Sequence, residues 1–99
     1  MFKLIYAEAA LRDIESIHGY LSDVRDPDFA RGYLEKLRVR IEALERNAHR
    51  FRERPELGPG CRALIAPPYL IFYRVKDDTA FIQRVLHGAR NIQPDDIGA

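Results

Sequence analysis

The residues best suited to chemistry in this 99-residue sequence lie in the segment His87-Gly88-Ala89-Arg90. The segment follows an apolar run typical of a β-strand, and functional side chains often occupy loops at strand ends. The imidazole of His87 can act as a general acid or base near neutral pH. The guanidinium of Arg90 can hold a carboxylate or a phosphate with two hydrogen bonds. A structural interpretation is equally good: His87 would hydrogen-bond the backbone, and Arg90 would pair with a nearby carboxylate.

Three further arginines each lie in one of three short apolar runs. Strand alternation would place Arg74 on the same face as Leu70 and Phe72. A face that mixes arginines with exposed apolar side chains is typical of a binding surface. A solvated sheet face with scattered apolar residues would show the same pattern. The candidate functional surface comprises Arg62, Arg74, Arg84, His87 and Arg90.

A second concentration of charge lies between residues 46 and 54. Basic residues at a helix C-terminus are stabilised by the helix dipole, which explains the cluster on its own. The alternative is a local patch that meets an acidic or phosphate partner. The net charge of the whole chain is only +1, so overall charge does not argue for nucleic acid. The basic residues are Arg46, His49, Arg50, Arg52 and Arg54, and the nearby acids are Glu45 and Glu53.

The motifs of common enzyme and metal-site classes are missing from the sequence. It contains no glycine-rich nucleotide loop and no local Ser-His-Asp arrangement, and His18, His49 and His87 lack metal-ligand spacing. The single Cys61 has no partner for an internal disulfide, which fits a reducing cytosol. No run approaches the roughly 18 apolar residues of a membrane span. We predict a cytoplasmic protein with no cofactor or metal.

Two helices are predicted from apolar residues at helical spacing. The first covers residues 8–22, with Glu8 in its first turn. The second covers residues 27–52, where Asp26 can cap the N-terminus and Pro27 suits the first helical position. At about 1.5 Å per residue the second helix would be roughly 35 Å long, and the pair would form an antiparallel hairpin. The apolar stripes are Leu11, Ile14, Ile17 or His18, and Leu21, then Ala30, Leu34, Leu37, Ile41, Leu44, Ala48 and Phe51.

A sheet is predicted from runs rich in β-branched and aromatic residues. The runs at 61–66, 69–75 and 80–86 predict an antiparallel meander with turns at Pro67-Pro68 and Asp77-Asp78. Residues 2–7 predict a strand that joins this sheet, because an isolated strand would leave its backbone unpaired. Residues 91–99 form a polar tail, which we expect to be loosely held. The prediction is one α+β domain over residues 1–99: an N-terminal strand, then an antiparallel helical hairpin packed on a three- to four-stranded antiparallel sheet.

Short motifs follow one another along the chain in a specific order. They are Leu4-Ile5-Tyr6, Ala9-Ala10, Asp13-Ile14, Pro55-Glu56-Leu57-Gly58, Gly60-Cys61-Arg62, Tyr69-Leu70-Ile71-Phe72-Tyr73-Arg74-Val75 and Val85-Leu86-His87-Gly88-Ala89-Arg90. Their order and spacing resemble the RelE/ParE superfamily of bacterial toxins from toxin–antitoxin modules. The similarity covers about residues 2–92 and is greatest to the ParE branch, often labelled plasmid stabilisation proteins.

The resemblance implies one of two activities. RelE-like members cut messenger RNA in the ribosome, whereas ParE-like members poison DNA gyrase without being nucleases. The nuclease type carries an arginine after the aromatic of its third strand, but here Leu70 follows Tyr69 and cannot donate hydrogen bonds to a phosphate. It also carries a tyrosine shortly after the last arginine, but no tyrosine follows Arg90. These departures favour a gyrase poison without enzymatic activity.

Two alternatives stay open at this point. One is a RelE-like ribosome-dependent endonuclease in which the candidate surface supplies replacement catalysts, namely Arg62, Arg84, His87 and Arg90. The other is a non-toxic member that only binds an antitoxin.

The resemblance also implies a ParD-like antitoxin as partner in a hetero-oligomer. Such an antitoxin has a dimeric DNA-binding domain followed by a segment that folds on the toxin, and an apolar helix in a groove is a standard recognition mode. The flank of the helical hairpin and the exposed sheet face would receive this segment, with Tyr33, Leu70 and Phe72 as candidate contacts. The toxin would contact DNA only through the antitoxin, and it would have no membrane partner.

Overall fold

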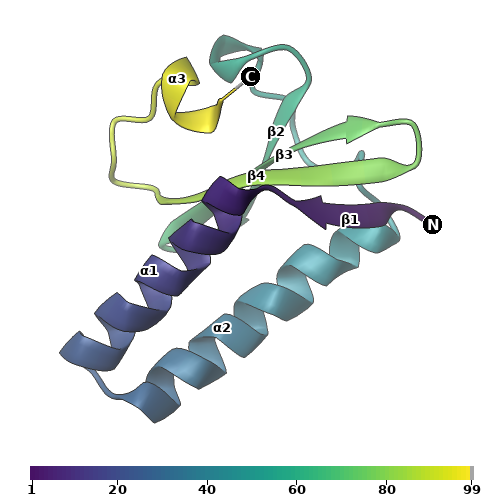
Figure 1. Cartoon of the computed structure of the whole chain (residues 1–99). Helices are drawn as coiled ribbons and strands as arrows, with labels where there is room; N and C mark the ends of the chain where they lie inside the picture. The colour runs from purple at the N-terminus through teal and green to yellow at the C-terminus, as the bar shows by residue number, and fades with distance from the viewer. Residues whose placement is uncertain (99) are drawn as a thin grey trace.

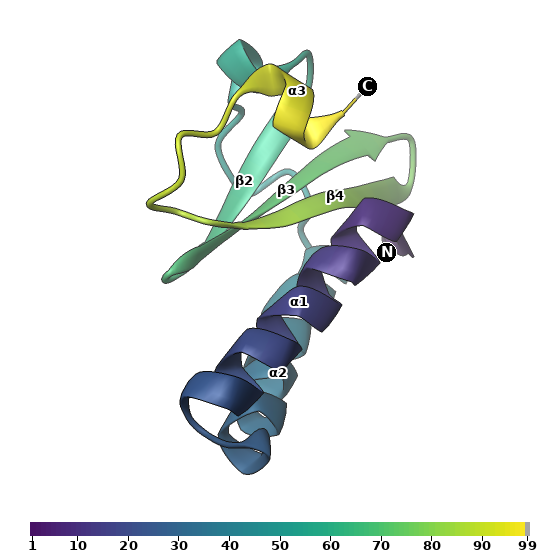
Figure 2. The ribbon, with the colours of Figure 1, turned by 60° about the vertical axis from the view of Figure 1, so that its left-hand side comes forward.

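The structure is a computed structural model that describes residues 1–98. Its four-stranded sheet lies between two long helices on one side and a short C-terminal helix on the other (Figure 1). Figure 2 shows the same separation after rotation, with α1 and α2 extending beyond the sheet as a hairpin. The predicted α+β fold is therefore confirmed. The elements are β1 (Lys3–Tyr6), α1 (Glu8–Val24), α2 (Pro27–Glu42), η1 (Ala43–Glu45), η2 (Pro55–Leu57), β2 (Cys61–Ala66), β3 (Tyr69–Lys76), β4 (Thr79–His87) and α3 (Pro94–Ile97).

The strands are ordered β1-β4-β3-β2, and the sheet is mixed. β2, β3 and β4 form the predicted antiparallel meander. β1 instead pairs in parallel with β4, with Lys3 opposite Thr79 and Tyr6 opposite Ile82, so the expectation of a fully antiparallel sheet is wrong for this strand. The reason is connectivity: the hairpin and two strands separate β1 from β4, so no tight turn forces them to run in opposite directions.

The start of α2 is as predicted, but its end is not. The Asp26 carboxylate accepts a hydrogen bond from the Phe29 backbone N–H at 2.8 Å, and Pro27 begins the helix. The helix ends at Glu42 after 16 residues, about 24 Å at about 1.5 Å per residue, instead of continuing to residue 52. Beyond it the Ala48 carbonyl accepts a hydrogen bond from the Tyr73 hydroxyl at 2.7 Å, which ties the chain to the sheet. After Glu42, hydrogen bonds to the sheet thus replace the hydrogen bonds of the helix, although apolar residues continue to recur at helical spacing.

The main core lies between the hairpin and the sheet. The α2 stripe is correct, since Ala30, Leu37 and Ile41 are all buried. In α1, Ala10 is fully buried, whereas the predicted core residue Leu11 is 52% exposed. The remaining buried members of this core are Ile17, Leu44, Ala48, Leu64, Ala66, Tyr69, Ile71, Tyr73, Ala80, Ile82 and Val85.

A second core occupies the sheet face that we expected to be open. Phe72 is 0% exposed there, so its predicted place on a binding surface is wrong. The C-terminal segment causes this, because Ile97 is buried against the sheet and α3 replaces the expected loose tail. Gln93 and Asp96 cap α3 reciprocally, while Ala99 lies outside the described residues. The other members of this core are Leu57, Cys61, Ala63 and Leu86, with Leu70 and Ile92 packed against it.

Candidate functional site

Arg84, one of the predicted surface arginines, holds three elements together. Its Nε and Nη2 donate to the Asp13 carboxylate of α1 at 2.7 and 2.9 Å, and Nη1 donates to the Asp96 carbonyl of α3 at 2.5 Å. Asp13 also accepts from the Val85 backbone N–H at 2.9 Å. The hydrogen bond to Asp13 raises the pKa of Arg84. This guanidinium is therefore a structural clamp with its hydrogen bonds made inside the fold.

Arg62 and Arg74 also bind within the molecule. Nη1 of Arg62 donates to the carbonyls of His49 at 3.1 Å and Phe51 at 2.6 Å, which fixes the chain after α2. Nε of Arg74 donates to Gln83 at 3.0 Å. The Arg74 guanidinium also lies against Gly58, where a Cβ atom would collide with it and where the φ of +135° disfavours other residues. Both Nη atoms of Arg62 are therefore engaged within the fold, whereas Arg74 is held through Nε alone and is half-buried.

His87 hydrogen-bonds the backbone and Arg90 pairs with a carboxylate, as the structural interpretation predicted, yet both side chains are exposed. Nδ1 of His87 accepts from the Ala89 backbone N–H at 3.1 Å, and its ring meets the Tyr69 ring edge-on at 5.5 Å. Nη2 of Arg90 pairs with the Asp96 carboxylate at 2.8 Å, with 48% of the Arg90 side chain exposed. Of the five predicted surface residues, these two remain accessible enough to contact a partner.

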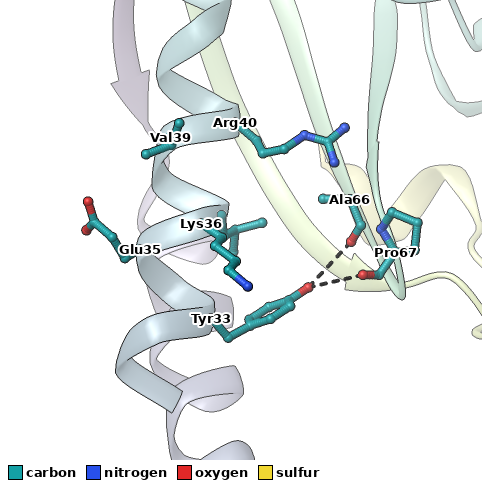
Figure 3. Close-up of a pocket in the computed structure, with 8 residues that line it drawn as sticks. Tyr33, Glu35, Lys36, Val39, Arg40, Ala66 and Pro67 are labelled. Atoms are coloured by element: carbon teal, nitrogen blue, oxygen red, sulfur yellow. Dashed lines mark hydrogen bonds between the residues drawn. The ribbon is translucent and has the colours of Figure 1, made fainter. Parts of the chain in front are cut away.

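A groove lies between α2 and the end of β2 (Figure 3). Its volume is about 460 Å³. The Tyr33 hydroxyl reaches across it and donates to the carbonyls of Ala66 and Pro67, each at 3.5 Å. Burial of its hydroxyl raises the pKa of Tyr33, and the electrostatic interaction with Tyr69 raises it further. The groove, which we call the α2–β2 groove, is lined by Tyr33, Glu35, Lys36, Leu37, Val39, Arg40, Ala66 and Pro67.

Exposed apolar and basic side chains surround the α2–β2 groove. Val39 in its wall is 56% exposed, and Ile65 at the β2 edge is 57% exposed. Nη2 of Arg40 donates to the Ile65 carbonyl at 2.5 Å, which joins the helix to this edge. The charged side chains of the groove lining are Lys36, Arg40 and Glu35, so the apolar surface has a small excess of positive charge that suits a peptide with apolar and acidic side chains.

The predicted antitoxin contacts differ in accessibility. Tyr33 lines both the α2–β2 groove and a neighbouring aromatic cleft of about 470 Å³ that also contains Tyr69 and His87. Leu70 is half-buried against the second core, and Phe72 is inaccessible. Sequence reasoning missed Val39 and Ile65. Val39 could have been found as an apolar residue outside the predicted α2 stripe.

The described residues limit two other classes of site. Within residues 1–98, no three His, Cys, Asp or Glu side chains gather as they would around a metal ion. No helix in this range combines the length and apolarity needed to cross a membrane.

The structure is thus a small α+β protein in which a helical hairpin packs on a four-stranded sheet and a groove lies between α2 and the end of β2. A solved structure described as the chromosomal ParDE TA system from P. aeruginosa is similar, with a TM-score of 0.79 and 24% sequence identity. The match covers 88% of this chain and 96% of the solved chain, which indicates a shared fold.

The family follows from the sequence over nearly the same range. Residues 4–92 match the model of the family described as the ParE toxin of the type II toxin–antitoxin system parDE. A comparison with curated proteins gave no match. Because the family model covers most of the sequence, this chain belongs to the ParE toxin family.

Proposed function

We propose that this toxin is neutralised by a ParD-like antitoxin whose C-terminal segment occupies the α2–β2 groove. The observation that carries the proposal is Val39, an aliphatic side chain 56% exposed in the wall of a concave surface. Burying such a side chain in a complex is favourable by about 1.5–3 kcal/mol, and Lys36 and Arg40 can pair with acidic side chains of the segment. The antitoxin gene would be a short neighbouring reading frame that encodes a ribbon-helix-helix domain.

Replacing Val39 by aspartate tests this assignment. Val39→Asp should weaken antitoxin binding at least tenfold in calorimetric titration, because it removes an apolar contact and places a carboxylate beside the acidic side chains proposed for the segment. Val24→Asp is the matched control, since Val24 is 54% exposed at the hairpin tip and does not line the groove. Equal affinities of the two variants would show that the antitoxin binds another surface.

We further propose that the target is DNA gyrase and that the toxin acts in the cytoplasm. Two sequence features support a gyrase poison over a ribosome-dependent nuclease: Leu70 follows Tyr69, and no tyrosine follows Arg90. The pairing of Arg90 with Asp96 also differs from a free phosphate-binding fork. Exposed His87 and Arg90 are the residues that we propose for contact with the target.

The target proposal is tested with purified components. The toxin should inhibit supercoiling by gyrase and stabilise its cleaved-DNA complex, and the antitoxin should reverse both effects. Codon-register cuts of messenger RNA on translating ribosomes, mapped by primer extension, would instead support the nuclease alternative. A protein that binds antitoxin but has neither effect would be a non-toxic member.

A further inference from the structure

The chain after η1 carries a cluster of positive charge that the fold does not neutralise. Arg46, Arg50 and Arg52, which we call the arginine edge, are all exposed. Within residues 1–98 none of them has a carboxylate within 4.0 Å. Of the ten other arginines, Arg25, Arg40 and Arg74 also lack a carboxylate within that distance, whereas seven have one: Arg12, Arg31, Arg38, Arg54, Arg62, Arg84 and Arg90.

The backbone beneath the arginine edge is held firmly although it is neither helix nor strand. The buried Tyr73 hydroxyl donates to the Ala48 carbonyl at 2.7 Å, and Arg62 donates to the Phe51 carbonyl at 2.6 Å. The Ala63 backbone N–H bonds the Arg52 carbonyl at 3.4 Å. A fixed backbone limits the positions of the three side chains, so less backbone entropy is lost when they bind.

The composition of the arginine edge identifies the kind of partner. Among residues 1–98, the exposed large apolar side chains include none from residues 43–54. At one end of the edge, Arg52 shares a cleft with Ile65 and with the acids Glu53 and Glu56. Protein interfaces depend on buried apolar and aromatic anchors, whereas a nucleic-acid backbone is bound mainly through charge. We propose that the arginine edge binds the phosphate backbone of duplex DNA without reading its sequence.

The choice of duplex DNA over RNA rests on the proposed function, because a gyrase poison works beside DNA. The phosphate chemistry rests on the charges alone. If the toxin makes this contact, it binds DNA directly and not only through the antitoxin, as we expected from the sequence. It would hold the toxin on the nucleic acid on which its target acts.

The size of the effect follows from the number of arginines. Residues 46 and 52 are six positions apart and thus at most about 20 Å, a length of duplex that carries roughly ten phosphates. Three phosphate contacts predict a slope of log affinity against log salt of about −2.7. Affinity should therefore fall about 40-fold between about 50 and 200 mM salt.

The experiment measures binding of the toxin alone to a short fluorescein-labelled DNA duplex by anisotropy over this salt range. The test variant is Arg46→Gln/Arg50→Gln/Arg52→Gln. The matched control, with the same change in net charge on the helical hairpin, is Arg12→Gln/Arg25→Gln/Arg31→Gln. We expect the test variant to lose at least tenfold in affinity and most of the salt slope, and the control to retain both. Circular dichroism confirms that both variants fold.

Three results would overturn the proposal. They are salt-independent or undetectable binding by the wild type, equal losses in the two variants, and binding of polyglutamate as tight as that of DNA. Tighter binding of an RNA duplex of the same sequence would overturn the assignment to DNA. Because gyrase and antitoxin are absent, a failure here is separate from a failure of gyrase inhibition.

Discussion

Tyr73→Phe removes a single hydroxyl and should destabilise the toxin measurably. Tyr73 is 0% exposed, and its hydroxyl donates to the Ala48 carbonyl at 2.7 Å. Phenylalanine keeps the packing but leaves that buried carbonyl without its donor, which costs about 1–3 kcal/mol. For a domain of this size, each 1 kcal/mol lowers the melting temperature by about 4–8 °C. Urea and thermal unfolding should therefore give a lower midpoint with an unchanged urea dependence.

Tyr73→Phe should also change how the free energy of unfolding depends on alkaline pH. Burial raises the pKa of Tyr73 from 10.0 to about 12, because the phenolate is less stable in the core than in water. The folded state therefore favours the neutral phenol more than the unfolded state does. This contribution is complete below pH 10 and is lost as the pH rises from 10 to about 12. Tyr73→Phe should lose less stability than the wild type over that interval.

Tyr20→Phe is the control, since Tyr20 is 60% exposed. It should unfold like the wild type at neutral pH. If Tyr73→Phe also matched the wild type in stability and alkaline response, the hydroxyl would not hold Ala48. The account of why α2 ends at Glu42 would then be wrong.

Three other changes test the remaining contacts. Asp13→Ala should lower the free energy of unfolding in urea by about 2–4 kcal/mol, since it leaves the partly buried Arg84 without its carboxylate partner. The double change Asp13→Ala/Arg84→Met should cost less than the sum of the two single changes. Additive effects would contradict the interaction between Asp13 and Arg84. Ile97→Asp should expose the second core and increase binding of a hydrophobic dye, whereas an unchanged signal would mean that α3 does not cover it. Arg90→Ala should lower the melting temperature only slightly, because 48% of the Arg90 side chain is exposed. The variant should still bind antitoxin but lose toxicity in colony counts; a folded variant that kills normally would exclude Arg90 from the target surface.

The elements that could be predicted are those specified by local spacing. The α2 stripe around Leu37 and the three meander strands depend on neighbours within a few residues, so periodicity is sufficient. The end of α2 was not predictable in this way. Ala48 continues the apolar spacing, but the bond that directs its carbonyl comes from Tyr73, 25 residues away. The direction of β1 is likewise set by pairing across the whole chain.

The covered second face was missed because the residues that cover it have no regular spacing. Ile92 and Ile97 are the apolar members of a polar tail, and a helix of four residues is too short to show a periodic pattern. Alternation correctly placed Phe72 opposite Tyr73, but it does not indicate whether a face is open to solvent. That depends on where the chain returns after β4.

The roles of the arginines depend on partners that the sequence does not reveal. Arg84 lies in an apolar run that suggested an exposed face, but its carboxylate partner Asp13 is 71 residues away. Pairing with a carboxylate changes what an arginine can do: a clamped guanidinium gives up existing hydrogen bonds before it can hold a ligand, whereas an unpaired one exchanges only water. On this ground Arg84 is assigned to the fold and Arg50 to a partner, although both looked alike in the sequence. The same distinction explains why the whole-chain charge of +1 is a poor guide to partners, since seven of the sixteen lysines and arginines already pair with a carboxylate. The side chains available for recognition are those left outside the ion pairs, and within residues 1–98 three of these, Arg46, Arg50 and Arg52, lie close together in the sequence, on the segment that Tyr73 and Arg62 hold in place.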